Sequence, residues 1–392
     1  MLKISEHVYW DGIQDWDLRL FHGHELSTHR GSTYNSYVIK DEKTVLVDTV
    51  WFPHKEKFIK RLDEEVGIGN IDMIIIQHNE QDHGGALEAI MEKRPEIPIY
   101  CTAFGEKIIK AHFHKDWNFI NVKTGDTLDI GKNTLTFVEM RMIHWPDSMM
   151  TYLDSDKVLL SNDAFGQHYC AKSMFNDEVD ADELYQEAIK YYANILTPFS
   201  PMIARKIDEV VKLNLDIEVI APSHGVIWRE NPLQIVEAYA DWAGGYKEDF
   251  AVIIYDTMYE ATLRMAESIE AGLRSKGVKV KLYNSSVSDM SDLLTEVFKA
   301  SALAVGSCTV NNNPLTSVVA ITHEILAHRM GGKPYVSFGS FGWSGEAPVQ
   351  IDKTLAESKL VQAAEPIKAR YRPTEDDLKS CYEAGVKLAE AI

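Results

Sequence analysis

The sequence predicts an α/β protein of two domains, the second of which is a doubly wound parallel sheet. Short β-branched runs alternate with helical stretches over residues 1–240, and from residue 251 onward strands and helices alternate regularly. The chain has 392 residues and is 45% hydrophobic, which is enough to build two or three packed domains. Regular strand–helix alternation is typical of a parallel sheet whose two faces are covered by helices.

The first domain contains strands that are recognised as short apolar and β-branched runs. We predict these strands at Val45–Val47, Met73–Ile76, Thr134–Val138, Val158–Leu160 and Ile217–Ile220, and a helix at Asp182–Asn194. The apolar pattern lapses around residues 243–249. We therefore expect a first domain of residues 1–248 and a second of residues 249–392.

The second domain shows a more regular period. Its predicted strands are Ala251–Tyr255, Val278–Tyr283, Leu303–Gly306 and Pro334–Phe338. Its predicted helices are Glu260–Lys276, Ser291–Ala300, Pro314–Arg329 and Glu375–Ile392. This βαβαβ series predicts that the sheet is parallel and covered on both faces.

Composition excludes several classes of partner. The net charge of −19 disfavours binding to nucleic acid and to anionic membranes. The N-terminus has no apolar signal core, and no apolar run approaches the roughly 18 residues of a membrane span. The four cysteines form no C-x-x-C pair, so we expect no rubredoxin-like or zinc-ribbon module in these residues and a reducing, cytoplasmic location.

The stretch QHNEQDHGG, residues 77–85, follows the second predicted strand and is unusually rich in imidazole and carboxylate. A solvated turn would use Gly, Asn, Asp or Ser and has no need of two histidines. Further such residues follow the next strands, and strand ends on one side of an α/β layer converge on one crevice. The candidate ligands are His78, Glu80, Asp82, His83, His144, Asp163 and His224.

This inventory of four imidazoles and three carboxylates is too large for one tetrahedral zinc ion, and it suits two metal ions bridged by a carboxylate. A hydrogen-bonded polar loop with isolated histidines is the simpler interpretation of any one of these residues alone. It does not account for ligand-type residues at the ends of four successive strands.

The ligand pattern resembles that of the flavodiiron proteins, also called A-type flavoproteins or rubredoxin:oxygen oxidoreductases. The resemblance extends over essentially the whole chain and includes residues 21–23 (FHG), 144–148 (HWPDS) and 162–166 (NDAFG). It implies a metallo-β-lactamase-like αβ/βα sandwich followed by a flavodoxin-like domain. Hydrolases of the first fold usually have a second histidine where this chain has Glu80, and a hard oxygen ligand favours iron.

The resemblance also implies roles for individual residues. One iron is expected on His78, Glu80 and His144, and a second on Asp82, His83 and His224, with Asp163 bridging the two. His22 and one of Tyr191 or Tyr192, of which we select Tyr192, are candidate catalytic groups able to donate a proton or hydrogen bond to a bound gas. A purely structural role for His22 is equally consistent with the sequence.

Three loops of the second domain predict an FMN site. Hydroxyl and backbone N–H groups at the start of the helix after the first strand can hold a phosphate. The loops after the third and fourth strands lie beside the switch point, where FMN rings bind in this fold. Ala261 departs from the usual Ser or Asn, and Trp343 can pack against the flavin. The expected FMN-binding residues are Thr257, Met258, Tyr259, Glu260, Ala261, Thr262, Ser307, Cys308, Thr309, Asn311, Asn312, Ser340, Phe341, Gly342 and Trp343.

Together these features predict a terminal reductase in which FMN supplies electrons to a di-iron site that reduces O2 to water, NO to N2O, or both. We expect an external electron donor, rubredoxin or another reduced carrier, and a homodimer or a dimer of dimers. Two alternatives are a zinc hydrolase with a flavodoxin-like appendage and a flavin electron carrier whose metal site has decayed. Glu80 argues against the first and the complete ligand set against the second.

Overall fold

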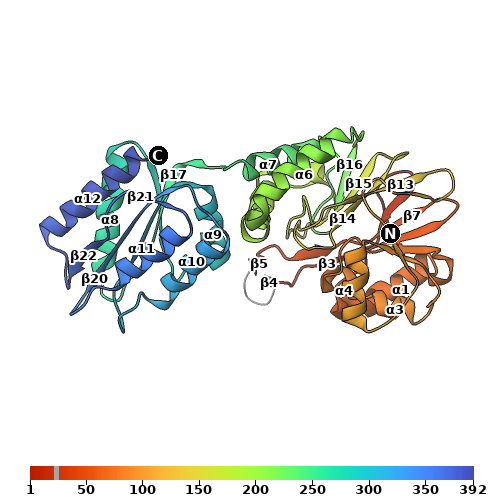
Figure 1. The fold of residues 1–392 in the computed structure, drawn as a ribbon, viewed down its shortest axis with the longest axis horizontal. Coiled ribbons are helices and arrows are strands. Elements are labelled where there is room, and N and C mark those ends of the chain that lie inside the picture. The colour runs from red at the N-terminus through yellow and green to blue at the C-terminus, as the bar shows by residue number, and fades with distance from the viewer. Residues whose placement is uncertain (22–25) are drawn as a thin grey trace. The chain divides into compact units, whose positions relative to one another are not determined.

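The computed structural model describes residues 1–21 and 26–392, which divide into two compact units (Figure 1). The first unit comprises Met1–Phe21, Thr28–Tyr192 and Phe199–Gly244. The second comprises Gly245–Ile392, to which Leu26–Ser27 and Ala193–Pro198 also belong. No helix in the described part of the chain has both the length and the apolar character needed to cross a membrane.

Two sheets form the centre of the first unit. The larger sheet has the order β1-β2-β7-β8-β9-β10-β11, with strands at Leu2–Lys3, Val8–Trp10, Tyr37–Lys40, Thr44–Val47, Met73–Ile75, Ile99–Cys101 and Phe119–Asn121. The smaller has the order β12-β13-β14-β15-β16, with strands at Thr127–Asp129, Thr134–Glu139, Met149–Leu153, Val158–Asn162 and Val219–Pro222. The short strands β3 (Ile13–Asp15) and β6 (Ser32–Tyr34) pair with each other, and β4 is Leu20–Phe21.

The core of the first unit lies between these two sheets. Val45, Val47 and Ile75 from the larger sheet share one buried cluster with Phe137 and Leu160 from the smaller. Alternate residues of a strand point to opposite faces, so a strand that is buried on both faces is apolar at nearly every position. The register Val45–Met73 and Val47–Ile75 between β8 and β9 is parallel and brings the ends of both strands to one edge.

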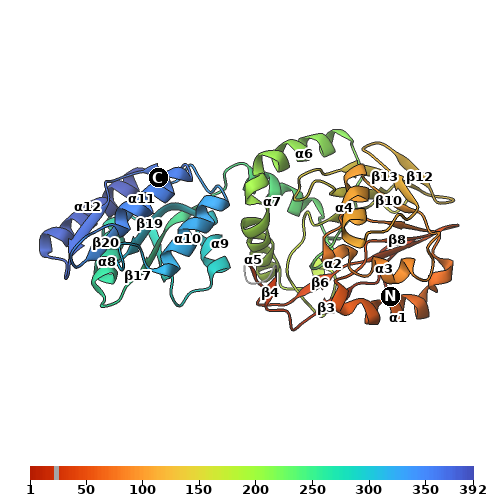
Figure 2. The same ribbon diagram turned by 60° about the horizontal axis from the view of Figure 1, so that its bottom comes forward.

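Helices cover the outer faces of this sandwich, with α1, α3 and α4 at one side and α6 and α7 at the other (Figures 1 and 2). Their bounds, with those of α2 and α5, are Lys55–Glu65 (α1), Gln81–Gly84 (α2), Leu87–Met91 (α3), Ala103–Phe113 (α4), Ala181–Tyr191 (α5), Ser200–Lys212 (α6) and Leu233–Ala243 (α7). Single 3₁₀ turns occur at Phe52–His54, Ile68–Asn70, Asn176–Glu178 and Thr197–Phe199, and a π turn at Tyr192–Leu196. The arrangement is the αβ/βα sandwich that the resemblance implied.

A parallel sheet organises the second unit. Its order is β18-β17-β19-β20-β21, and β22 also pairs with β20, with strands at Glu248–Asp256 (β17), Lys279–Asn284 (β18), Ala300–Ser307 (β19), Pro334–Phe341 (β20), Val361–Gln362 (β21) and Ile367–Arg370 (β22). Strand β5 is Leu26–Ser27. Strand β17 lies between β18 and β19, so successive parallel strands are added first on one side of β17 and then on the other. This change of side creates a switch point at the carboxyl end of the strands.

Five helices cover this sheet, with α8 and α12 on one face and α9, α10 and α11 on the other (Figure 1). They span Ala261–Ser275 (α8), Met290–Lys299 (α9), Thr316–Ala327 (α10), Ala347–Glu357 (α11) and Glu375–Glu390 (α12). Helices α8 and α12 touch backbone to backbone at two glycines. A Cβ atom on Gly272 would lie 2.1 Å from the carbonyl oxygen of Tyr382, and one on Gly385 would lie 2.2 Å from that of Ile269.

The predicted fold class is confirmed, and the predicted strands and helices are present with shifts of a few residues. In the second unit, helix α11 and the strands β21 and β22 were missed, and in the first unit ranges were predicted for only five strands and one helix. Strand β22 is only four residues long, and exposed residues alternate with less exposed ones along it, so its apolar signal is weak. This omission matters because the loop after β22 contributes to the flavin pocket described below.

Candidate metal centre and flavin site

The ligand-rich loop begins where β9 ends and continues into the single turn of α2. Glu80 occupies the N-cap position of α2, and Asp82 and His83 lie on its only turn. Two glycines allow this compact path. A Cβ atom on Gly84 would lie 2.3 Å from Oδ1 of Asn79, and one on Gly85 would lie 2.3 Å from the carbonyl oxygen of Gln81. The pair Gly84–Gly85 therefore fixes the loop that presents four ligand-type side chains.

One group of ligand-type atoms comes from three segments of the first unit. His78 Nε2 lies 3.2 Å from Glu80 Oε2, and His144 Nε2 lies 3.7 Å from the same oxygen. Asp163 Oδ2 lies 3.1 Å from His144 Nε2 and 3.7 Å from His78 Nε2. These four residues each offer an atom within 4.8 Å of the others, which suits coordination of a single cation.

A second group adjoins the first. His224 Nε2 lies 3.0 Å from Asp82 Oδ2, and His83 Nε2 lies 3.4 Å from the same oxygen. The other oxygen of Asp163, Oδ1, lies 2.9 Å from His83 Nε2 and 3.7 Å from His224 Nε2. Asp163 therefore directs one carboxylate oxygen to each group, as a bridging ligand between two cations does.

Two of the imidazoles are oriented by groups behind them. His78 donates from Nδ1 to Asp147 Oδ1 over 3.1 Å, and Asp147 Oδ2 accepts from the backbone N–H of Asn79 over 2.9 Å. His224 donates from Nδ1 to the carbonyl oxygen of Thr33 over 2.6 Å. In both rings this leaves Nε2 directed at the ligand groups, the arrangement in which a histidine presents a lone pair to a metal.

Burial and opposite charge act against each other throughout this centre. Burial lowers the pKa of His78, but its hydrogen bonds to Asp147 and Glu80 raise the pKa well above its usual value. Burial also lowers the pKa of His83, but the charges of Asp82 and Asp163 raise it to about 9. Burial raises the pKa of Asp163, and the neighbouring His83 and His144 bring it well below its usual range. The carboxylates are thus held ionised and suited to a cation.

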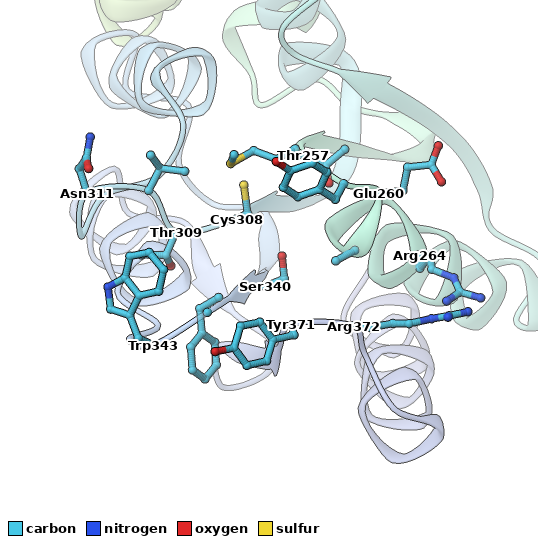
Figure 3. Close-up of a pocket in the computed structure, with 16 residues that line it drawn as sticks. Thr257, Glu260, Arg264, Cys308, Thr309, Asn311, Ser340, Trp343, Tyr371 and Arg372 are labelled. Atoms are coloured by element: carbon cyan, nitrogen blue, oxygen red, sulfur yellow. The ribbon is translucent and has the colours of Figure 1, made fainter.

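The second unit contains a cavity of about 850 Å³ at the carboxyl end of its sheet (Figure 3). Its volume is in the range of small-molecule and cofactor sites. The cavity is lined by Thr257, Met258, Tyr259, Glu260, Ala261, Arg264, Cys308, Thr309, Val310, Asn311, Ser340, Phe341, Gly342, Trp343, Tyr371 and Arg372. The hydroxyl oxygen of Thr257 is buried there and has no hydrogen-bond partner among the described residues, as a group that receives a ligand would.

Comparisons with known proteins agree with the two parts of the fold. The family model described as ODP family beta lactamase matches residues 33–225, and the flavodoxin model matches residues 253–385. The anaerobic nitric oxide reductase flavorubredoxins of Vibrio vulnificus YJ016 and Escherichia coli K12 are 45% and 47% identical over 99% of this chain, which spans 79% and 82% of their length. The chain belongs to the flavodiiron protein family.

Solved structures show the flavodiiron fold over the whole chain. Rubredoxin oxygen:oxidoreductase from Desulfovibrio gigas superposes with a TM-score of 0.97 and 36% identity, covering 100% of this chain and 98% of that one. The flavodiiron protein from Giardia intestinalis superposes with a TM-score of 0.90 and 32% identity, covering 100% and 97%. The predicted family, with its lactamase-like and flavodoxin-like parts, is therefore confirmed, and the hydrolase alternative is not favoured.

The structure of this flavodiiron protein places the two tyrosines considered as catalytic groups in different surroundings. Tyr192 bonds through its hydroxyl to Ser200 Oγ at 2.8 Å, and its ring packs against Tyr239 and Trp242. Tyr191 has its ring centroid 6.2 Å from that of His224. Successive helical residues point about 100° apart, so the two side chains meet different neighbours, and the catalytic role of Tyr192 stays a prediction. The other predicted group, His22, lies outside the described residues.

Sequence analysis also overlooked residues at the metal centre. His168 has its ring centroid 5.0 Å from that of His224 and 5.1 Å from that of Tyr191, and its Nδ1 lies 2.7 Å from Ser32 Oγ. Asp147 was quoted in the HWPDS stretch without a role. A carboxylate three residues after a ligand histidine was a signal that could have identified Asp147, whereas His168 had no such signal.

Three of the predicted flavin-site residues do not line the cavity. Thr262 is buried with its hydroxyl 3.2 Å from that of Ser340, and Ser307 accepts a hydrogen bond from the backbone N–H of Leu315. Asn312 bonds through its carbonyl oxygen to Gln350. These residues shape the loops and leave contact with a ligand to their neighbours. The cavity residues that were missed are Arg264, Val310, Tyr371 and Arg372.

Proposed function

We propose that this flavodiiron protein is a terminal reductase that takes electrons from an external donor and reduces O2 to water, NO to N2O, or both. The observation that carries the proposal is the pair of ligand groups that share Asp163, in a chain that also contains a flavin-sized cavity. The V. vulnificus and E. coli relatives are named for nitric oxide reduction and the D. gigas protein for oxygen reduction. All three names describe an oxidoreductase.

For the metal centre we propose two iron ions, one held by His78, Glu80 and His144 and the other by Asp82, His83 and His224, with Asp163 shared. Iron bound by these residues would supply the redox chemistry that reduction of the gas requires. The protein's part is to fix the ligand atoms of seven residues, to orient the rings of His78 and His224 through Asp147 and Thr33, and to keep the centre buried. Glu80 contributes the hard oxygen that favours iron over zinc.

For the cavity we propose one non-covalently bound FMN. The start of α8 and the hydroxyl of Thr257 suit the phosphate, because backbone N–H groups at a helix N-terminus are unpaired and partly positive. Trp343 and Tyr371 line the opposite part of the cavity and can pack against the flavin ring. FMN accepts and delivers electrons one or two at a time, which allows a one-electron donor to serve a multi-electron reduction.

We further propose that the chain acts in the cytoplasm as a homodimer and takes electrons from rubredoxin or a similar carrier. All four cysteines are free and buried, which suits a reducing compartment. A two-fold dimer can place the flavin of one copy beside the metal centre of the other, and isologous dimers are the commonest assemblies. We propose domains of residues 1–248 and 249–392, and the division of compact units between Gly244 and Gly245 supports this boundary to within a few residues.

The proposal is tested by metal analysis and by anaerobic turnover with each gas in the presence of chemically reduced rubredoxin. We expect about two iron ions and one FMN per chain, and gas consumption that depends on both. A protein that contains zinc, hydrolyses ester or amide substrates and consumes neither gas contradicts the proposal. Comparison of the O2 and NO rates then decides which gas is preferred.

A further inference from the structure

The loop that carries His224 is bound by a buried asparagine from a distant part of the chain. Asn35 lies just after β6, and it is 1% exposed. Its side-chain nitrogen donates to the carbonyl oxygen of Pro222 over 2.8 Å and to that of Gly225 over 3.0 Å. Its backbone N–H donates to the carbonyl oxygen of Ser223 over 2.8 Å. One residue therefore binds the backbone on both sides of a proposed metal ligand.

The orientation of the Asn35 amide is fixed by a further partner. Its Oδ1 accepts a hydrogen bond from Nε1 of Trp10 over 2.7 Å. An indole N–H can only donate and a carbonyl oxygen can only accept, so turning the amide over would lose every one of its side-chain hydrogen bonds. Both amide hydrogens and the amide oxygen are thus used. This leaves Asn35 with one orientation and the bound loop with one position relative to it.

A second buried amide binds the same loop from another segment. Gln167 follows Asp163 in one loop and is fully buried. Its Oε1 accepts from the backbone N–H of Val226 over 2.8 Å, and its Nε2 donates to the carbonyl oxygen of that residue over 3.2 Å. Gly225 makes room for this contact, because it has φ 77° and a Cβ atom there would lie 1.9 Å from Gln167 Oε1. Gln167 therefore connects the segment of the shared ligand Asp163 to the loop of His224.

These contacts determine where the imidazole of His224 points. Its Nδ1 donates to the carbonyl oxygen of Thr33, two residues before Asn35 in the chain. Thr33 Oγ1 also accepts from the backbone N–H of Gly225 over 2.7 Å. The same short segment thus fixes both the backbone around His224 and the acceptor of its ring. A ring held at Nδ1 in this way presents Nε2, which lies 3.0 Å from Asp82 Oδ2 of the second ligand group.

We propose that Asn35 and Gln167 are positioning residues for the second ligand group, which hold the loop of His224 so that its imidazole faces the other ligands of that group. This inference rests on the proposed metal centre. The first ligand group has no such dependence, because the ring of His78 is oriented by the carboxylate of Asp147. Loss of either amide should therefore weaken the binding of one metal ion and spare the other.

The test is a titration of the full-length, metal-free protein with cobalt(II), followed by visible absorption and by competition with a chelator. Asn35→Asp keeps the shape and the bond from Trp10, but a carboxylate has no hydrogen to donate to the two carbonyl oxygens. Gln167→Glu makes the same change on the other side of the loop. We expect the parent to bind two ions per chain, and each variant to bind one of the two roughly 10- to 100-fold more weakly.

Two further backgrounds identify the ion that is affected. His144→Ala removes a ligand of the first group only, so that cobalt(II) binding reports the second group, whereas His224→Ala leaves the first group intact. Asn35→Asp should weaken cobalt(II) binding roughly 10- to 100-fold in the His144→Ala background and by less than about twofold in the other. The visible spectrum of the bound ion should change only in the His144→Ala background, because it depends on coordination geometry.

A matched control separates positioning from folding. Asn176 is another buried asparagine of the first unit, and it binds the same stretch of chain a few residues after His224. Its Oδ1 accepts from the backbone N–H of Arg229 over 2.9 Å, and its Nδ2 donates to the carbonyl oxygen of Glu230 over 2.9 Å. Asn176→Asp should lower the melting temperature and leave cobalt(II) affinity within about twofold of the parent.

Each outcome supports or overturns the inference. If Asn35→Asp and Gln167→Glu bind both ions as tightly as the Asn176→Asp control does, the amides do not position His224 and the inference is wrong. If Asn35→Asp weakens binding equally in the two backgrounds, it disturbs the fold as a whole, and the inference is again wrong. Thermal melts confirm folding, and if Asn35→Asp does not fold, Gln167→Glu decides in the same way. If the parent binds no metal ion, the proposed metal centre itself fails, which is a distinguishable result.

Discussion

The metal centre and the flavin cavity differ in the burial of their side chains and in whether their charged groups have partners in the protein. At the metal centre every proposed ligand except Glu80 and His144 is buried, and the imidazoles and carboxylates neutralise one another. At the flavin cavity Trp343 is 84% exposed and Tyr259 is 86% exposed, and the side chains of Arg264 and Arg372 make no hydrogen bond or ion pair within the described part of the chain. The first site is organised by its own side chains, whereas the second depends on its ligand for complementary charge and packing.

The largest effect is expected at Asp163, because it belongs to both ligand groups. Asp163→Asn should abolish gas reduction and remove most of the iron, while FMN content stays unchanged. Removing one partner from a buried charged network costs roughly 3–5 kcal/mol, so the free energy of unfolding of the first unit should also fall. Iron analysis, flavin absorbance and denaturant unfolding measure the three quantities. A variant that retains two iron ions would show that Asp163 is not shared.

A smaller effect is expected when only the orienting group behind a ligand is removed. Asp147→Asn loses the acceptor of the His78 Nδ1–H hydrogen bond and should weaken metal binding roughly 10- to 100-fold. The matched control is Asp116→Asn, which removes an exposed carboxylate paired with Lys110. Competition with a chelator measures the affinity of each. Equal affinities in the two variants would mean that the ring of His78 needs no second partner.

A hydrogen-bonded carboxylate in the first unit should make the free energy of unfolding depend on pH in the acid range. Burial raises the pKa of Asp156, but hydrogen bonds from Ser5, His7 and Ser155 lower it below its usual 3.8. A carboxyl with a depressed folded pKa stabilises the protein above the unfolded pKa and loses that contribution as the pH falls through the folded value. Asp156→Asn should therefore lower the free energy of unfolding by about 1–2 kcal/mol near neutral pH.

The difference between the parent and Asp156→Asn should shrink as the pH falls below 3.8, the usual carboxyl pKa. Denaturant unfolding at a series of pH values measures it. If the difference in free energy of unfolding stays constant down to the pH of acid unfolding, the charge of Asp156 does not contribute to stability.

The smallest effect concerns backbone strain at the flavin cavity. Glu260 has φ 63°, a left-handed conformation that Asn tolerates better than Glu. Glu260→Asn should raise the free energy of unfolding of the second unit by at most about 1 kcal/mol, whereas Glu260→Gln removes the charge but keeps the strain. If both variants tighten FMN binding equally, charge repulsion is responsible. If Glu260→Gln raises the melting temperature as much as Glu260→Asn does, relief of backbone strain is not the cause of the stabilisation.

Much of the fold was predictable because the buried strands are apolar runs with clear ends. Strands β8, β9, β13 and β15 were predicted within about two residues. The seven ligand-type residues were also identified from the sequence and lie together in the structure, although their binding of iron stays a prediction. Strand β22 was missed because its apolar pattern is short and weak.

The sequence by itself determined the chemistry that the chain can perform, because metal preference follows from residue type. Four imidazoles with three carboxylates, and Glu80 in place of histidine, indicate a two-metal site from residue type alone. Only the tertiary structure decided which residues support these groups. Asp147, His168, Tyr191 and Arg372 acquire their places through contacts between segments far apart in the chain and through the direction of each side chain, and neither is encoded in local sequence spacing.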